Sequence, residues 1–141
     1  MSVSFPLKLS VVTITYADPV GLRLTVDSLR PLFGVWSASE WEHVIVDGSL
    51  TVNRQVLDDL PAGWPLVHVE QSAGGVPHAF NEAVATATGA YIWFLNGGDT
   101  LCDPAALARI LGVLDGDRAA DFACGGVYLS RDGLALYPAF P

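Results

Sequence analysis

The chain has 141 residues, of which 51% are hydrophobic and 16% are charged. This composition excludes a disordered protein, and the length suits a single domain. Fifteen acidic residues against seven basic ones give a net charge of −8. Nucleic acid and anionic membrane surfaces bind clustered lysine and arginine, so we expect neither as a partner.

The sequence carries no sign of a membrane span or of a secretion signal. Its longest apolar runs, such as Ala90–Leu95, have the length of a strand and fall well short of the ~18 residues of a transmembrane helix. Met1–Lys8 lacks the basic region and long apolar core of a signal peptide. Cys102 and Cys124 show no C-x-x-C spacing, so we expect both thiols to be buried. These features predict a cytoplasmic protein, and the inner face of the membrane is the second location that we consider for it.

Apolar segments of strand length alternate with amphipathic helical segments, a pattern typical of a parallel α/β sheet with flanking helices. Strands are predicted at Leu7–Thr15, Glu42–Val46, Leu66–Val69, Tyr91–Leu95 and Phe122–Leu129. Helices are predicted to begin at Pro19, Pro77 and Pro104, with a short helix between Val52 and Leu60.

Local signals mark several of the helix ends. Asp18 and Asp103 each precede a proline, the arrangement of an N-cap followed by the first helical residue. Gly89 stands where the helix that begins at Pro77 would need a C-cap. The first helix has an apolar stripe with 4-3-4 spacing, formed by Leu22, Val26, Leu29 and Phe33.

The C-terminal segment ends without a closing helix. Arg131–Gly133 has the composition of a turn, and Leu134–Pro141 is apolar and rich in proline. Folded domains seldom finish in this way. We therefore expect residues 1–141 to form a single domain that is the N-terminal part of a larger protein.

Small and polar residues gather where the predicted strands end. In open parallel sheets, ligands bind at the carboxyl ends of the strands, beside the point where strand order reverses. The segments at these ends are Tyr16–Asp18, Asp47–Ser49, Gln71–Gly75 and Asn96–Asp99. Asp-Gly and Gly-Gly are also ordinary turn formers, so each segment alone is a weak signal.

The common phosphate-binding motifs are missing from the sequence. Neither G-x-G-x-x-G nor G-x-x-x-x-G-K-[ST] occurs, which argues against a dinucleotide site and a P-loop. An acidic sheet edge without basic residues suits a nucleotide held through a divalent cation. Mg²⁺ or Mn²⁺, which prefer oxygen ligands, would bridge two phosphates.

Four segments give the chain a family resemblance: Ser10–Tyr16 (SVVTITY), Val44–Ser49 (VIVDGS), Gly75–Asn81 (GVPHAFN) and Ala87–Asp99 (ATGAYIWFLNGGD). In order and spacing they resemble the family-2 glycosyltransferases of GT-A fold, over nearly the whole chain. The last segment is most similar to members of bacterial exopolysaccharide and lipopolysaccharide assembly. The resemblance implies a Rossmann-like, mostly parallel sheet and an inverting hexosyltransferase. Its donor would be a nucleotide-diphospho-sugar, commonly a UDP-sugar, its cofactor Mg²⁺ or Mn²⁺, and its acceptor a glycan or lipid-linked sugar.

The resemblance also implies roles for individual residues. Thr15 and Tyr16 would border the nucleobase, with Tyr16 stacked on it. Asp47 would accept a hydrogen bond from the imide N–H of the base. His78 lies in the donor loop, and Asn81 would lie near the sugar and diphosphate, where a helix N-terminus favours anions.

The predicted metal site departs from the usual family pattern. Asp99 matches the last acidic position of the family's D-x-D region, which implies a metal ligand. Asn96 and Gly98 stand where the commoner form has acidic residues. Asn96 stays a candidate donor-site residue, and phosphates and water would supply more of the coordination.

The resemblance leaves the catalytic residues unknown, because the family's catalytic base and acceptor site lie further along the chain. We therefore expect this chain to be inactive alone and to self-associate as a homodimer through uncovered apolar surface. One alternative is a non-catalytic nucleotide- or partner-binding module with a degenerate metal site. A weaker alternative, a sugar nucleotidyltransferase, lacks the expected N-terminal loop rich in glycine and lysine.

Overall fold

The computed structural model describes residues 9–49, 51–71, 74–116, 121–123, 125–131 and 134–138. The chain divides into two compact units, Met1–Cys102 and Asp103–Pro141, which are taken in turn below. The expectations for Met1–Lys8, for Cys124 and for the turn residues at 132 and 133 lie outside the described residues. The single domain over residues 1–141 stays a prediction.

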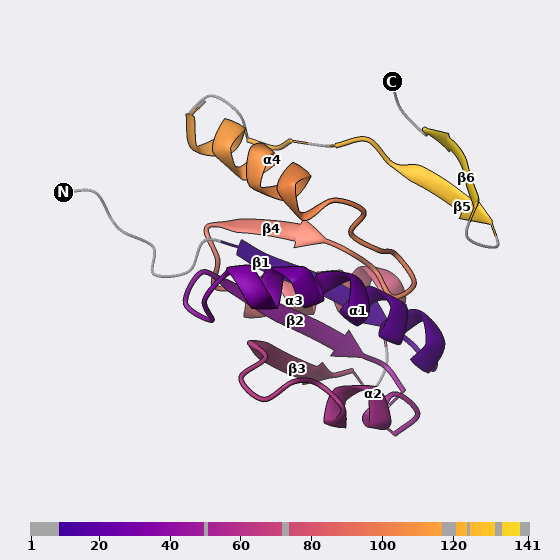
Figure 1. Ribbon diagram of the computed structural model, residues 1–141. Helices are drawn as coiled ribbons and strands as arrows, with labels where there is room; N and C mark the ends of the chain where they lie inside the picture. The colour runs from indigo at the N-terminus through magenta and orange to yellow at the C-terminus, as the bar shows by residue number, and fades with distance from the viewer. Residues whose placement is uncertain are drawn as a thin grey trace. The chain divides into compact units, whose positions relative to one another are not determined.

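The first unit is built on a parallel sheet, as the sequence predicted. Its strands are β1 (Leu9–Thr15), β2 (Trp41–Asp47), β3 (Leu66–Glu70) and β4 (Tyr91–Phe94). Its helices are α1 (Pro19–Val35), α2 (Arg54–Asp58) and α3 (Gly75–Thr86). Within the described residues the strands pair in the order β3-β2-β1-β4, and every pair is parallel (Figure 1).

The two central strands are buried, which explains their apolar sequences. Strand β2 is buried along its whole length and β1 as far as Thr13. Central strands of a parallel sheet are covered on both faces, and near-continuous apolar runs result. Val12, Val44 and Val46 pack against Ala79 and Ala83 of α3. Figure 1 shows α1 across the other face of the sheet.

Helix α1 begins as its local sequence predicts. The Asp18 carboxylate accepts a hydrogen bond from the Gly21 amide at 2.9 Å, and Pro19 is the first helical residue. This cap satisfies one of the free N–H groups at the helix start. The predicted stripe is buried at Leu22, Val26 and Leu29 and half-buried at Phe33.

Helix α3 corrects two predictions. It begins at Gly75, two residues before Pro77, and it ends at Thr86 with Ala87 as its C-cap. Gly89 is therefore no helix cap. A Cβ at Gly89 would lie 2.6 Å from the Ser10 backbone nitrogen, so glycine is required by close packing against β1.

The second unit contains α4 (Pro104–Gly116) and an antiparallel pair, β5 (Tyr128–Arg131) and β6 (Leu134–Pro138). Asp103 caps α4 as predicted, because its carboxylate accepts from the Ala105 amide at 2.9 Å. The predicted strand Phe122–Leu129 is wrong. The strand starts only at Tyr128, after two glycines that disfavour strand structure, and it pairs with β6 instead of extending the parallel sheet.

Two further expectations can be compared with the structure. Cys102 is exposed in the segment between β4 and α4, so its predicted burial is wrong. It lies outside the apolar helix stripes and strands that fill the core. None of the helices in the described part of the chain combines the length and hydrophobicity needed to cross a bilayer.

Candidate functional site

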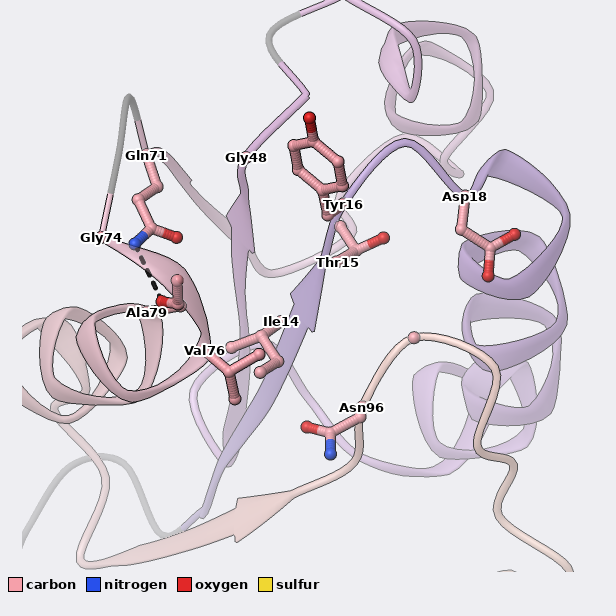
Figure 2. Close-up of a pocket in the computed structure, with 12 residues that line it drawn as sticks. Ile14, Thr15, Tyr16, Asp18, Gly48, Gln71, Gly74, Val76, Ala79 and Asn96 are labelled. Atoms are coloured by element: carbon pink, nitrogen blue, oxygen red, sulfur yellow. Dashed lines mark hydrogen bonds between the residues drawn. The ribbon is translucent and has the colours of Figure 1, made fainter.

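The carboxyl ends of the four parallel strands surround a cavity of about 670 Å³ (Figure 2). The chain runs from β1 through β2 to β3 on one side, then returns to place β4 on the other side of β1. Ligand sites of open α/β sheets form at such a reversal. The cavity is lined by Ile14, Thr15, Tyr16, Asp18, Gly48, Gln71, Gly74, Gly75, Val76, Ala79, Asn96 and Gly97.

The structure brings together some of the predicted site residues. Thr15, Tyr16 and Asn96 line the cavity. The other four are not among its lining residues, although Asp47 directly precedes the lining residue Gly48. These four are Asp47, His78, Asn81 and Asp99. The apolar wall was missed by the sequence analysis: Ile14, Val76 and Ala79 belong to β1 and α3, where apolar side chains look like ordinary core.

Tyr16 stands at the end of β1 with 76% of its surface exposed. Its ring lies against Gly48, where a Cβ would approach the ring carbon Cδ2 to 2.9 Å. Glycine at this position therefore leaves room for the aromatic ring. Figure 2 shows the side chains of Tyr16 and Thr15 beside Gly48, among the residues that line the cavity. An exposed aromatic face at a cavity mouth suits stacking on a planar ligand.

Asp47 is 1% exposed, and one of its oxygens is saturated. Oδ1 accepts hydrogen bonds from the Ser49 amide at 2.9 Å, the Ser49 hydroxyl at 2.6 Å and the Asn53 amide nitrogen at 3.0 Å. Oδ2 accepts none from the described residues. Asn53 was missed by the sequence analysis, because an asparagine before a short helix looks like an ordinary cap.

The turn after β4 is held by helix α1. The Thr25 hydroxyl accepts from the Gly98 amide at 2.9 Å and donates to the Asp99 carbonyl oxygen at 2.7 Å. Gly97 approaches β1 closely, since a Cβ there would lie 3.2 Å from the Thr15 hydroxyl. Asp99 itself is exposed, and Asn96 Oδ1 is buried with no hydrogen-bond partner among the described residues.

His78 and Asn81 lie on the first turns of α3 and are exposed. His78 Nε2 lies 3.3 Å from a carboxylate oxygen of Glu82, one helical turn further on. The His78 ring covers Gly74, whose φ of +134° and closeness to the ring both require glycine. The start of α3 thus presents its backbone and the His78 side chain beside the cavity.

The oxygen donors of the described residues at this edge are too few to hold a divalent cation without a bound ligand. The described residues hold no cluster of three or more His, Cys, Asp or Glu that would bind a metal by itself. Mg²⁺ usually keeps several waters and takes one or two carboxylates together with substrate phosphates. The Asp99 carboxylate and the unpartnered Asn96 Oδ1 match that smaller donor set.

A buried hydrogen-bond chain runs through the sheet to the end of β4. Trp64 donates its indole N–H to His43 Nδ1 at 3.2 Å, and His43 Nε2 lies 2.9 Å from the Thr13 hydroxyl. Thr13 in turn donates to the Leu95 carbonyl at 2.7 Å. Burial lowers the pKa of His43 to about 3, so the ring is neutral and Nε2 carries the hydrogen. The histidine therefore has a structural role and supports the residue before Asn96 through Thr13.

Comparisons with known proteins identify the family of the chain. The model of the family "Glycosyl transferase family 2" matches residues 10–139. Two uncharacterized glycosyltransferases of Mycobacterium tuberculosis, from strains CDC 1551 and H37Rv, are each 32% identical over 109 residues. That match covers 76% of this chain, which spans 40% of the length of each relative.

Two solved structures share the fold. The structure of S. aureus TarS residues 1–349 has a TM-score of 0.67 and 22% identity, covering 77% of this chain and 32% of that one. The mannosyltransferase PcManGT from Pyrobaculum calidifontis, in complex with GDP-Man and Mn²⁺, has a TM-score of 0.61 and 22% identity. The match covers 76% of this chain and 32% of the PcManGT chain. The GT-A fold expected from the sequence is confirmed, and the chain belongs to glycosyl transferase family 2.

Proposed function

We propose that this chain forms the part of a glycosyltransferase that binds a nucleotide-diphospho-sugar, with a UDP-sugar as the donor. The observation that carries the proposal is the cavity at the strand ends, with the open ring of Tyr16 at its mouth. The whole protein would transfer the sugar to a glycan or lipid-linked acceptor in polysaccharide biosynthesis. The curated relatives, which are named glycosyltransferases, support sugar transfer.

The nucleobase would lie at the end of β1. Its flat face would stack on Tyr16, and the Thr15 side chain would border it. Asp47 Oδ2, which accepts no hydrogen bond from the described residues, would accept the imide N–H of uracil. A carboxylate acceptor favours bases that present an N–H donor on that edge.

The diphosphate would lie between α3 and the turn after β4. The N-terminus of α3 favours anions, and His78 and Asn81 would contact the diphosphate or the sugar. Asn96 and Asp99 would hold a divalent cation, Mg²⁺ or Mn²⁺. The complex of PcManGT with GDP-Man and Mn²⁺ supports such a cation in this fold. When bound, the cation would stabilise the negative charge of the departing diphosphate.

The transfer would invert the anomeric configuration through direct attack by an acceptor hydroxyl. A carboxylate outside this chain would take the proton of that hydroxyl, so the 141-residue chain would lack turnover alone. The reaction would take place in the cytoplasm or at the inner face of the membrane. The related proteins give no support for the homodimer expected from the sequence.

Calorimetric titration of the chain with UDP, in Mn²⁺ and in EDTA, tests the proposal. We expect binding in both conditions and tighter binding with Mn²⁺, and Asp99→Ala should remove the difference. Asp58→Ala is the matched control, because Asp58 is an exposed aspartate on α2 away from the cavity lining. Equal UDP affinity in Mn²⁺ and EDTA would favour the non-catalytic module. Failure to bind any nucleotide would overturn the proposed function.

A further inference from the structure

Asn53 is fully buried, yet its side chain does not cap the helix that it precedes. Its amide nitrogen instead donates to Asp47 Oδ1 at 3.0 Å and lies 3.4 Å from the Thr15 hydroxyl. Because a carboxylate only accepts hydrogen bonds, the nitrogen of Asn53 must face Asp47. Its own oxygen is buried without a partner among the described residues. A leucine would fill the same space without leaving a buried oxygen unpaired. The benefit of asparagine at this position is therefore the hydrogen bond that its nitrogen donates to Asp47.

That nitrogen completes the saturation of one carboxylate oxygen. Ser49 supplies two donors to Asp47 Oδ1, at 2.9 Å from its amide and 2.6 Å from its hydroxyl, and Asn53 supplies the third. A carboxylate oxygen has about two lone-pair sites, so Oδ1 has no capacity for a ligand. The same three bonds fix the orientation of the carboxylate. Asp47 is thereby left with one oxygen, Oδ2, for hydrogen bonding to a base.

We infer that Asn53 and Ser49 set the base specificity of the donor site, so that it takes uridine nucleotides and rejects guanosine nucleotides. Uracil presents one N–H between two carbonyls, which a single carboxylate oxygen satisfies. Guanine presents two adjacent N–H donors, which pair best with both oxygens of a carboxylate. With Oδ1 occupied, one guanine donor would stay unpaired, and a buried unpaired donor is strongly unfavourable. This inference rests on the proposed function, because it needs a nucleotide at Tyr16 and Asp47.

The test compares UDP with GDP on the same chain by calorimetry in Mn²⁺. We expect wild-type protein to bind UDP at least tenfold more tightly than GDP. In Ser49→Ala/Asn53→Leu, Oδ1 keeps only its hydrogen bond from the backbone amide of residue 49 and gains room for a second donor. UDP binding should therefore weaken, and the ratio of the two dissociation constants should fall at least threefold. Ser49→Thr keeps the hydroxyl and should keep the wild-type ratio. The wild-type ratio tests the inference even where the buried Asn53→Leu change prevents folding.

The outcomes separate this inference from the proposed function. Wild-type protein that binds GDP as tightly as UDP, or more tightly, would overturn the inference and leave a nucleotide site in place. A folded double variant with an unchanged ratio would also overturn it. Failure of the wild-type chain to bind either nucleotide would overturn the proposed function and the inference together.

Discussion

The Thr25 hydroxyl donates to the carbonyl oxygen of Asp99 at 2.7 Å, across 74 residues of sequence. The hydroxyl oxygen of Thr25 also accepts from the Gly98 amide at 2.9 Å, so one buried side chain of α1 satisfies two backbone groups of the turn. Ser28, one turn further along α1, accepts from the Leu101 amide at 3.0 Å. The candidate metal residue is therefore placed by helix α1 as well as by its own turn, in which the Asp99 amide donates to the Asn96 carbonyl at 2.9 Å.

We predict that Thr25→Val loosens this turn. Valine keeps the shape of threonine but removes two hydrogen bonds, each with a net value of about 0.5–1.5 kcal/mol. The free energy of unfolding should fall by roughly 1–3 kcal/mol in urea denaturation. The Mn²⁺-dependent gain in UDP affinity should shrink as well, whereas Thr25→Ser should keep it. If Thr25→Val left the Mn²⁺-dependent gain in UDP affinity unchanged, the hydroxyl would have no part in placing Asp99.

We predict that Tyr16→Ala weakens UDP binding about five- to 150-fold, since stacking of a base on an aromatic ring contributes roughly 1–3 kcal/mol. The free energy of unfolding should change by less than about 0.5 kcal/mol, as is usual for exposed positions. Tyr16→Phe keeps the ring and should bind like wild type. A normal dissociation constant for the alanine variant would place the base elsewhere.

We predict an acid sensitivity that comes from His43. The folded chain keeps this histidine neutral with a pKa of about 3, whereas the unfolded chain takes up a proton near pH 6.5. Protons therefore bind preferentially to the unfolded state, and each pH unit below 6.5 costs about 1.4 kcal/mol of stability from this group until the pKa near 3 is reached.

Urea denaturation from pH 7 to 4 of wild type and His43→Gln measures this effect. The free energy of unfolding of wild type should exceed that of His43→Gln by roughly 3 kcal/mol less at pH 4 than at pH 7, because only wild type carries the titrating ring. NMR should show no titration of His43 above about pH 4.5 in the folded chain, well clear of its pKa. Parallel pH profiles for the two proteins would contradict the buried neutral ring.

We predict opposite effects for alanine at two glycines. Gly89→Ala should destabilise the chain, because the new Cβ would lie 2.6 Å from the Ser10 backbone nitrogen. A Cβ at Gly112, within α4, would meet no described atom within 4 Å, so Gly112→Ala should stabilise that helix by up to about 1 kcal/mol. Thermal unfolding of both variants checks the signs, and a stable Gly89→Ala protein would contradict the close packing.

The sequence predicted the parts of the fold that depend on neighbouring residues. The cap at Asp18 and the buried stripe of α1 follow from signals within one or two helical turns. The role of Gly89 could not be predicted from such local signals, because the atoms that exclude a side chain there belong to Ser10, 79 residues away. Strand β5 was also misplaced, since its partner β6 and the glycines before it decide where pairing starts.

The candidate site shows the same division. Thr15, Tyr16 and Asn96 were found because parallel strand ends meet at one edge of the sheet. Asn53 and Thr25 were not identified from the sequence, because nothing in the sequence distinguishes them from ordinary residues of a helix or helix end until their hydrogen-bond partners are known. The roles of Asp47, His78, Asn81 and Asp99 stay predictions, which the nucleotide titrations address.

A polar pair between β1 and β2 also favours one alignment of these strands over others. Ser10 lies opposite Glu42 and donates to its carboxylate at 2.6 Å, and Thr15 lies opposite Asp47 at the other end. Because both strands are largely apolar and buried, their few polar residues distinguish one alignment from another. A slip of two residues would place Ser10 opposite Val44 and bury the Glu42 carboxylate without its hydroxyl partner. The Ser10–Glu42 pair therefore makes the observed register of β1 and β2 more stable than the slipped one, before any ligand is present.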